Sequence, residues 1–253
     1  MIDKTCLSYW YPILEASGTP TPKTVIIPAL IDLSPLLDGE TPDGFDGLVA
    51  AVRSACADVG YPAFLRTGFG SGKHSWNETC FVRNEIGVPS HIAALVEWGA
   101  CVDMLGLPTS VWAVREFLRL RHSFTAFDGM PVADEYRFFV RDGAIQCAHP
   151  YWPPDSIRDP SSSEWRERLA AHNDAPIPVE LTALVERHAK AFDGAWSFDW
   201  ACTKDGRWVA IDMADAARSF HWPGCEHAPL EHDFSDPRMD GFSLTAMLDG
   251  VDE

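Results

Sequence analysis

Two aspartates near the end of the chain are spaced to face each other across a β-hairpin. The segments Trp196–Thr203 and Arg207–Met213 have the composition of strands, and Asp205–Gly206 between them is typical of a two-residue turn. Such a turn would place Asp199 directly opposite Asp212, where two carboxylates about 5 Å apart repel each other unless a proton or cation lies between them. Magnesium prefers such oxygen ligands. The alternative is a longer turn with a shifted register, in which both aspartates face water.

The same register assigns the other side chains of the hairpin to two faces. On the aspartate face it places Ser197, Ala201, Thr203, Trp208 and Ala210, and on the core face Phe198, Trp200, Cys202, Val209 and Ile211. One face is therefore expected to join the hydrophobic core, and the other to carry the chemistry.

A glycine-rich segment in the first third of the chain, FLRTGFGSGKHSW at residues 64–76, could wrap phosphate groups. It combines three glycines with two cations: Gly68, Gly70, Gly72, Arg66 and Lys73. It is not a P-loop, because Thr67 and His74 occupy positions where that motif needs Gly and Ser or Thr. The alternative is a flexible Gly-Ser loop with incidental cations.

Two further segments place an arginine in a strand-like run. In ADEYRFFV, residues 133–140, Arg137 alternates with Glu135, and a half-buried arginine needs an anion. That anion is either a carboxylate of the fold, Glu135 among them, or a bound triphosphate. In VWAVREFL, residues 111–118, an apolar run is interrupted at Arg115, as expected where a strand passes an adenine between two lobes.

Taken in chain order, these segments resemble the successive nucleotide-site elements of ATP-grasp proteins. SFDWAC and VAIDMAD, within the hairpin, complete the series, and the resemblance runs from Tyr9 to Asp215. The branch that looks most similar contains a cell-division-cycle protein that assists assembly of a translation initiation factor, because YWYP and KTVIIP near the start of the chain also resemble it. The resemblance implies ATP and magnesium as cofactors.

The resemblance also assigns roles to individual residues. The implied nucleotide contacts are Arg66, Gly70, Ser71, Gly72, Lys73, Arg115, Glu116, Phe117, Leu118 and Arg137; the implied magnesium ligands are Asp199, Asp212 and Asp215; and the implied catalytic residues are Arg137, Lys73 and Arg218. Two positions depart from the family. Arg66 stands where lysine is common, and Ala214 stands where an asparagine usually follows the last acid by two residues.

The reaction that the resemblance implies is ATP-dependent ligation. A carboxylate would be activated as an acyl phosphate and attacked by an amine or thiol, with the cations stabilising the transferred phosphoryl group. No residue identifies either substrate. The alternatives are an assembly factor that binds ATP and a protein partner without ligation, and a scaffold that has lost nucleotide binding.

Composition narrows the possible partners and compartment. The net charge of −17 disfavours nucleic acid, while a few converging cations can still hold a small anion. The seven cysteines are scattered without a CxxC pair, which predicts reduced thiols and a cytoplasmic protein. We expect no signal peptide and no membrane association, because the chain has no apolar stretch of the required length.

Alternating helices and hairpins predict an α+β fold with two antiparallel-sheet lobes and the nucleotide site between them. The expected domains are an N-terminal segment (1–60), a small lobe with the glycine-rich loop (61–118) and a larger lobe with the hairpin and tail (119–253). The expected strands are Lys23–Pro28, Pro62–Arg66, Val111–Leu118, Val132–Val140 and Ala144–Tyr151, and the expected helices are Phe45–Val59, Ser90–Leu105, one capped by Ser161 and Glu164, and Pro178–Phe192.

Overall fold

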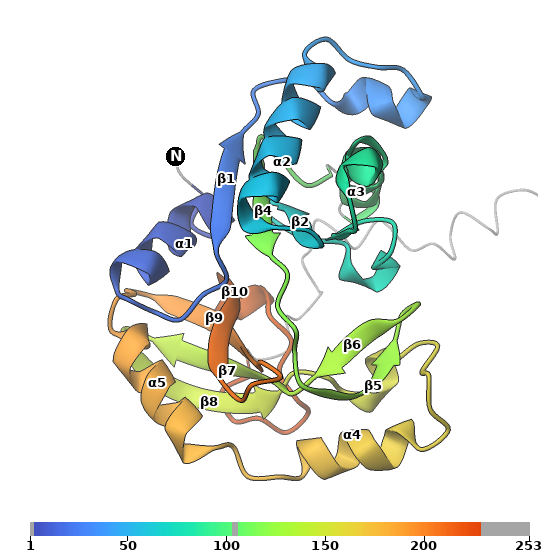
Figure 1. The fold of residues 1–253 in the computed structure, drawn as a ribbon. Helices are drawn as coiled ribbons and strands as arrows, with labels where there is room; N and C mark the ends of the chain where they lie inside the picture. Colours follow the sequence, from blue (N-terminus) through green and yellow to red (C-terminus); the bar gives the residue numbers. More distant parts are fainter. Residues whose placement is uncertain (1–2, 103–105, 229–253) are drawn as a thin grey trace, which may run out of the picture. The chain divides into compact units, whose positions relative to one another are not determined.

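The computed structural model describes residues 3–102 and 106–228. The chain divides into two compact units, Met1–Ser219 and Phe220–Glu253. Every named helix and strand of the described chain belongs to the first unit (Figure 1), and the described part of the second, residues 220–228, consists of turns and irregular segments. Among the described residues, no helix is long and apolar enough to cross a membrane.

The small lobe of the first unit is built on a four-stranded antiparallel sheet of order β1-β4-β2-β3. Its strands are β1 (Thr24–Pro28), β4 (Val111–Glu116), β2 (Ala63–Thr67) and β3 (Phe81–Val82). Helices α2 (Phe45–Val59) and α3 (Val88–Val102) pack on this sheet (Figure 1), and their apolar faces share a core with Leu65, Trp112 and Val114. The expected helix end at Leu105 lies outside the described residues.

The large lobe is built on a second antiparallel sheet, of order β10-β9-β7-β8. Its strands are β7 (Glu135–Arg141), β8 (Ala144–Pro150), β9 (Ala195–Cys202) and β10 (Trp208–Asp215). Helices α1 (Leu7–Ala16) and α5 (Val179–Ala189) contribute Trp10 and Leu181 to its core beside Phe198 and Trp200. The expected fold class, α+β with two antiparallel sheets, is confirmed.

A two-stranded sheet of β5 (His122–Ala126) and β6 (Met130–Ala133) adjoins helix α4 (Trp165–Asn173), and the two share a third core with Trp76 and Trp152. Short 3-10 turns complete the unit: η1 (Ser34–Asp38), η2 (Lys73–Ser75), η3 (Glu85–Gly87), η4 (Pro154–Ser156) and η5 (Ala216–Arg218). The single strand expected over 132–140 is therefore two strands, β6 and β7, divided at Asp134.

Two local features differ from expectation for identifiable reasons. The capping box does not form, because α4 begins one residue after Glu164 and the Ser161 hydroxyl instead accepts a hydrogen bond from the Thr125 N–H (3.0 Å). Helix α1 is not among the expected helices, because Pro12 lies inside it. Proline removes one donor from the helix, and burial of Trp10 and its neighbours against the large sheet offsets that loss.

The register of the terminal hairpin is confirmed at the aspartates and wrong near the turn. Asp212 pairs with Asp199, as predicted. The turn, however, spans three residues, because the Thr203 N–H donates to the Arg207 carbonyl (2.8 Å) and the Gly206 N–H to the Thr203 carbonyl (2.9 Å). A bulge between Ala210 and Asp212 restores the predicted register.

This bulge corrects the assignment of faces. Trp208 pairs with Cys202 and Ala210 with Trp200, so these two residues of β10 lie in the core rather than on the aspartate face. Ile211 is the extra residue of the bulge, and it lines the same cleft as Asp212 instead of filling the core. The longer turn shifts the first half of β10 by one residue, which exchanges its two faces.

Candidate nucleotide site

Most of the residues predicted to bind a nucleotide line one cleft between the two large sheets. Of the predicted set, the cleft contains Arg66, Ser71, Lys73, Arg115, Glu116, Phe117, Leu118, Asp199 and Asp212. The other lining residues are Pro22, Phe64, Trp76, Leu120, Met130, Pro131, Ala133, Glu135, Trp152 and Ile211. Cations and carboxylates therefore meet in a cleft whose remaining wall is largely apolar and aromatic.

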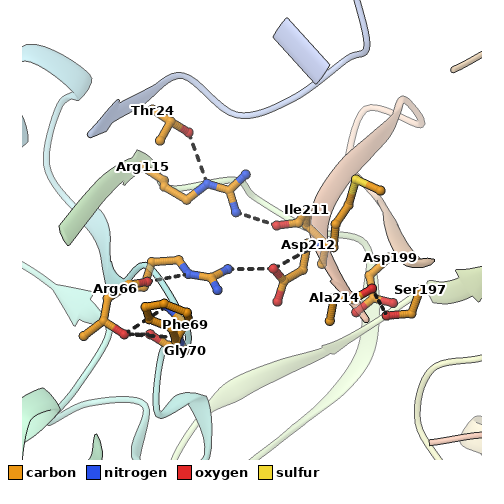
Figure 2. A network of polar contacts seen from close by, with 12 residues as sticks. Thr24, Arg66, Phe69, Gly70, Arg115, Ser197, Asp199, Ile211, Asp212 and Ala214 are labelled. Atoms are coloured by element: carbon orange, nitrogen blue, oxygen red, sulfur yellow. Dashed lines mark hydrogen bonds and ion pairs between the residues drawn. The ribbon is translucent and has the colours of Figure 1, made fainter. Parts of the chain in front are cut away.

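Arg66 connects the small lobe to the aspartate pair. It projects from β2 and donates from Nη1 to Asp212 Oδ1 on β10 at 2.9 Å, while its Nε donates to the Thr67 carbonyl (Figure 2). The Arg66 side chain is only 6% exposed. Burial alone would raise the pKa of Asp212, but the charge and hydrogen bond of Arg66 outweigh it and hold that pKa below its ordinary value.

Arg115 runs beside Arg66 toward the same strand (Figure 2). Its Nε donates to Thr24 Oγ1 at 3.2 Å and its Nη1 to the Ile211 carbonyl. Its Nη2 is buried without a hydrogen-bond partner in the described chain. Burial, aided by the nearby Arg66, lowers the pKa of Arg115 to about 10, so the side chain stays charged at neutral pH. A buried cationic donor is thus left over for an anion.

Arg137 and Asp199 form a two-point ion pair within the large sheet. They are direct cross-strand partners on β7 and β9, and Nε and Nη2 of Arg137 each donate to one carboxylate oxygen at 2.8 Å. Burial alone would lower the pKa of Arg137, but Asp199 raises it above its ordinary value. The anion that Arg137 is predicted to need is therefore Asp199. Arg137 is not among the residues that line the cleft.

Lys73 rests on an aromatic surface at the cleft wall. Its Nζ lies 4.0 Å from the ring centroid of Tyr151 and 4.6 Å from that of Trp152, which are cation–π distances. Burial would lower the pKa of Lys73, but Tyr151 and the carboxylates of Glu135 and Asp199 raise it above its ordinary value. Trp152 is not among the predicted site residues, and its buried indole N–H has no acceptor among the described residues.

Glu135 is a buried acid that the predicted site does not include. It is 3% exposed and lines the cleft, and its Oε1 accepts no hydrogen bond from any residue that the structure describes. Burial raises its pKa to about 7, with the charge of Lys73 acting in the opposite direction. Sequence alternation places Glu135 beside Arg137, and its lack of a bonding partner is what distinguishes it.

The glycine-rich loop is fixed at both ends and packs closely on α3. Thr67 Oγ1 accepts from the Gly70 N–H at 3.1 Å, and Thr79 Oγ1 donates to the Gly72 carbonyl at 2.8 Å. A Cβ at Gly70 would collide with the ring of Trp98. Gly70 and Gly72 thus allow close packing of the backbone, whereas Ser71 between them lines the cleft.

The aromatic part of the wall suits a planar base. Trp76 stacks on Phe81 with ring centroids 4.7 Å apart and planes 8° from parallel, and the ring centroid of Phe117 lies 5.9 Å from that of Trp76. Phe64 adds a further ring to this group. Phe117 and Leu118 follow the end of β4, where the chain passes from the small lobe to β5.

Asp215 and Arg218 lie outside this cleft. Asp215 pairs with Trp196 and so projects from the face of β10 opposite to that of Asp212. Its carboxylate accepts a hydrogen bond from the Ala217 N–H at 3.0 Å. Arg218 is exposed on η5. The structure therefore brings Asp199 and Asp212 together and does not bring Asp215 or Arg218 to them.

The cleft residues fit a nucleotide carried with magnesium. Arg115 Nη2 and Trp152 Nε1 are buried donors without acceptors in the described chain, and Glu135 Oε1 is a buried acceptor without a donor there. Such atoms are rare in folded proteins, and several in one cleft indicate that a polar ligand completes their bonding. Asp199 and Asp212 supply the oxygen ligands that magnesium prefers.

Comparison with known proteins gives one family match. The model of an ATP-grasp domain family, family 3 of its clade, matches residues 55–229. No curated protein matches the sequence. Cdc123 from Schizosaccharomyces pombe has a similar solved structure, with a TM-score of 0.52 and 15% identity over 97% of this chain and 90% of that chain. A RimK domain ATP-grasp protein from Sphaerobacter thermophilus gives a TM-score of 0.47 and 17% identity over 83% of this chain, and this chain covers 59% of that protein.

Proposed function

The chain belongs to the ATP-grasp domain family whose model it matches, and we propose that it binds ATP with magnesium in the cleft and uses it to ligate a carboxylate to an amine or thiol. The observation that carries this proposal is the cleft itself. Three cations, Arg66, Lys73 and Arg115, converge there on the aspartate pair, within a protein whose net charge is −17. Such a local concentration of positive charge suits a phosphate chain.

In this proposal the present ion pairs are the resting partners of the phosphate-binding groups. Arg66 would exchange Asp212 for a phosphate oxygen and so release the carboxylate for magnesium. Arg115 would donate from its spare Nη2, and Lys73 would reach the phosphates from its aromatic surface. Arg137 would orient Asp199 through the two-point pair instead of contacting phosphate, which makes it a positioning residue.

Magnesium, when bound, would neutralise charge on the phosphate chain during transfer. The protein's own contribution is a fixed set of cations around the γ-phosphate and a wall that excludes water from an acyl phosphate. Phe64, Trp76 and Phe117 would enclose the base, and the backbone after β4 would read its edge. The substrate carboxylate and its acceptor would enter beside Lys73.

The test is trapping of the acyl phosphate. Hydroxylamine and ATP are supplied with a panel of amino acids, peptides and other carboxylic acids, and both hydroxamate and ADP are measured. An acid that yields the two products in equal amounts supports the ligase, and Lys73→Met should abolish the reaction while exposed Lys190→Met on the protein surface should not. ADP formation without hydroxamate for every acid would contradict it.

Ala214 favours a second candidate, an assembly factor that binds ATP and a protein partner without ligation. The position carries no side-chain oxygen where the family usually has an asparagine, which would weaken phosphoryl transfer more than nucleotide binding. The same experiment separates the two candidates, because an assembly factor would bind ATP without producing hydroxamate.

A further inference from the structure

Glu135 lies on the same face of the large sheet as the aspartate pair. On β7, Arg137 pairs with Asp199 and Glu135 pairs with Ala201, so Glu135 is displaced from Asp199 by one strand and two residues. Diagonal neighbours on one sheet face have Cβ atoms about 7–8 Å apart. A glutamate side chain can bridge that distance to an ion bound by Asp199.

The contacts of Glu135 do not account for its burial. Its side chain is 3% exposed, and Oε1 has no hydrogen-bond partner in the part of the chain that the structure describes. Lys73 is the nearest candidate for a salt bridge, yet its Nζ lies over the rings of Tyr151 and Trp152. A buried carboxylate oxygen without a partner is costly, and a cation bound in the cleft would remove that cost.

The opposite flank of the aspartate pair has no such oxygen. Two residues beyond Asp212, Ala214 pairs with Ser197 and offers only a methyl group. A magnesium ion held by Asp199 and Asp212 therefore lacks a third carboxylate on the β10 side, whereas a carboxylate stands on the β7 side. Three carboxylate oxygens leave half of an octahedron for phosphate oxygens and water.

We propose that Glu135 supplies the third carboxylate ligand of the magnesium site and so replaces the side chain that Ala214 lacks. The proposal rests on the proposed function, because it requires that magnesium enters this cleft with ATP. It assigns to β7 a metal ligand that the family resemblance does not indicate, and it makes Glu135 and Ala214 parts of one arrangement.

The test uses manganese as a spectroscopic substitute for magnesium and needs no turnover. Free manganese is counted by electron paramagnetic resonance in the presence of a non-hydrolysable ATP analogue, for the wild type, Glu135→Gln and Glu186→Gln. Glu186 is an exposed acid on α5, so its variant makes the same change in charge far from the chemistry. Binding of the analogue without metal is measured in parallel by calorimetry.

We expect Glu135→Gln to weaken manganese binding by at least about tenfold while metal-free binding of the analogue is unchanged or tighter, and Glu186→Gln to match the wild type. Adding Ala214→Asn to Glu135→Gln should recover part of the manganese affinity. Wild-type manganese affinity in Glu135→Gln would overturn the inference, and so would an equal loss of metal-free analogue binding. If the wild type bound neither analogue nor manganese, the proposed function itself would fail.

Discussion

Replacing Glu135 by glutamine should make the unfolding of the protein less sensitive to pH. In the folded protein, burial raises the pKa of Glu135 from 4.5 to about 7. Below the lower value both folded and unfolded states hold the proton, and above the higher value neither does. Between them the unfolded state loses its proton first, so the stability of the wild type falls as pH rises through this window.

The size of the effect follows from the two pKa values. Their difference corresponds to on the order of 3 kcal/mol of stability lost between about pH 4.5 and about pH 8. For a unit of roughly 200 residues, each 1 kcal/mol moves the unfolding temperature by about 2–4 °C. The wild type should therefore lose about 6–12 °C more than Glu135→Gln across this window.

Differential scanning calorimetry without nucleotide or divalent metal provides the assay, with Glu186→Gln as the control for a lost surface charge. The control should follow the wild type at every pH. At the alkaline end Glu135→Gln should be the more stable protein, because glutamine carries no charge to bury. Parallel curves for the wild type and Glu135→Gln would refute the assignment of a buried, uncompensated carboxylate at this position.

Two other substitutions test the packing of the site. Arg137→Ala should lower the free energy of unfolding by about 3–5 kcal/mol, because it leaves Asp199 buried without its partner; urea denaturation measures this, and a loss below about 1 kcal/mol would contradict the role of the pair. Gly70→Ala should cost about 1–3 kcal/mol in the same assay, because its Cβ collides with the Trp98 ring, and Trp98→Ala in that background should relieve the clash. An unaltered denaturation midpoint in Gly70→Ala would show that the loop does not pack on Trp98.

The positions of the paired aspartates could be predicted from sequence because strand alternation and an Asp-Gly turn together determine a register. The prediction holds at Asp199 and Asp212 although the turn is one residue longer than expected, since the bulge at Ile211 compensates. Sequence offers no signal for such a pair of cancelling irregularities. The predicted faces of Trp208 and Ala210 are therefore wrong while the aspartate pairing is right.

The ATP-grasp resemblance is confirmed by the family match, and it rests on the order of the segments more than on any one of them. What local sequence does not encode is the pairing of charges. Whether Arg137 meets Glu135 or Asp199 depends on which strand lies beside β7, and the strand order β10-β9-β7-β8 is not contained in local pattern. The availability of Glu135 follows from the same fact, because Arg137 is already held by Asp199.

The measurement that tests the central claim most directly is calorimetric titration of the protein with ATP, with and without magnesium, for the wild type and Asp212→Ala. The wild type should bind ATP more tightly when magnesium is present. The variant should lose that dependence on magnesium, because half of the aspartate pair is gone. A wild type that binds no ATP, or a variant whose magnesium-dependent binding is undiminished, would contradict the assignment of this cleft.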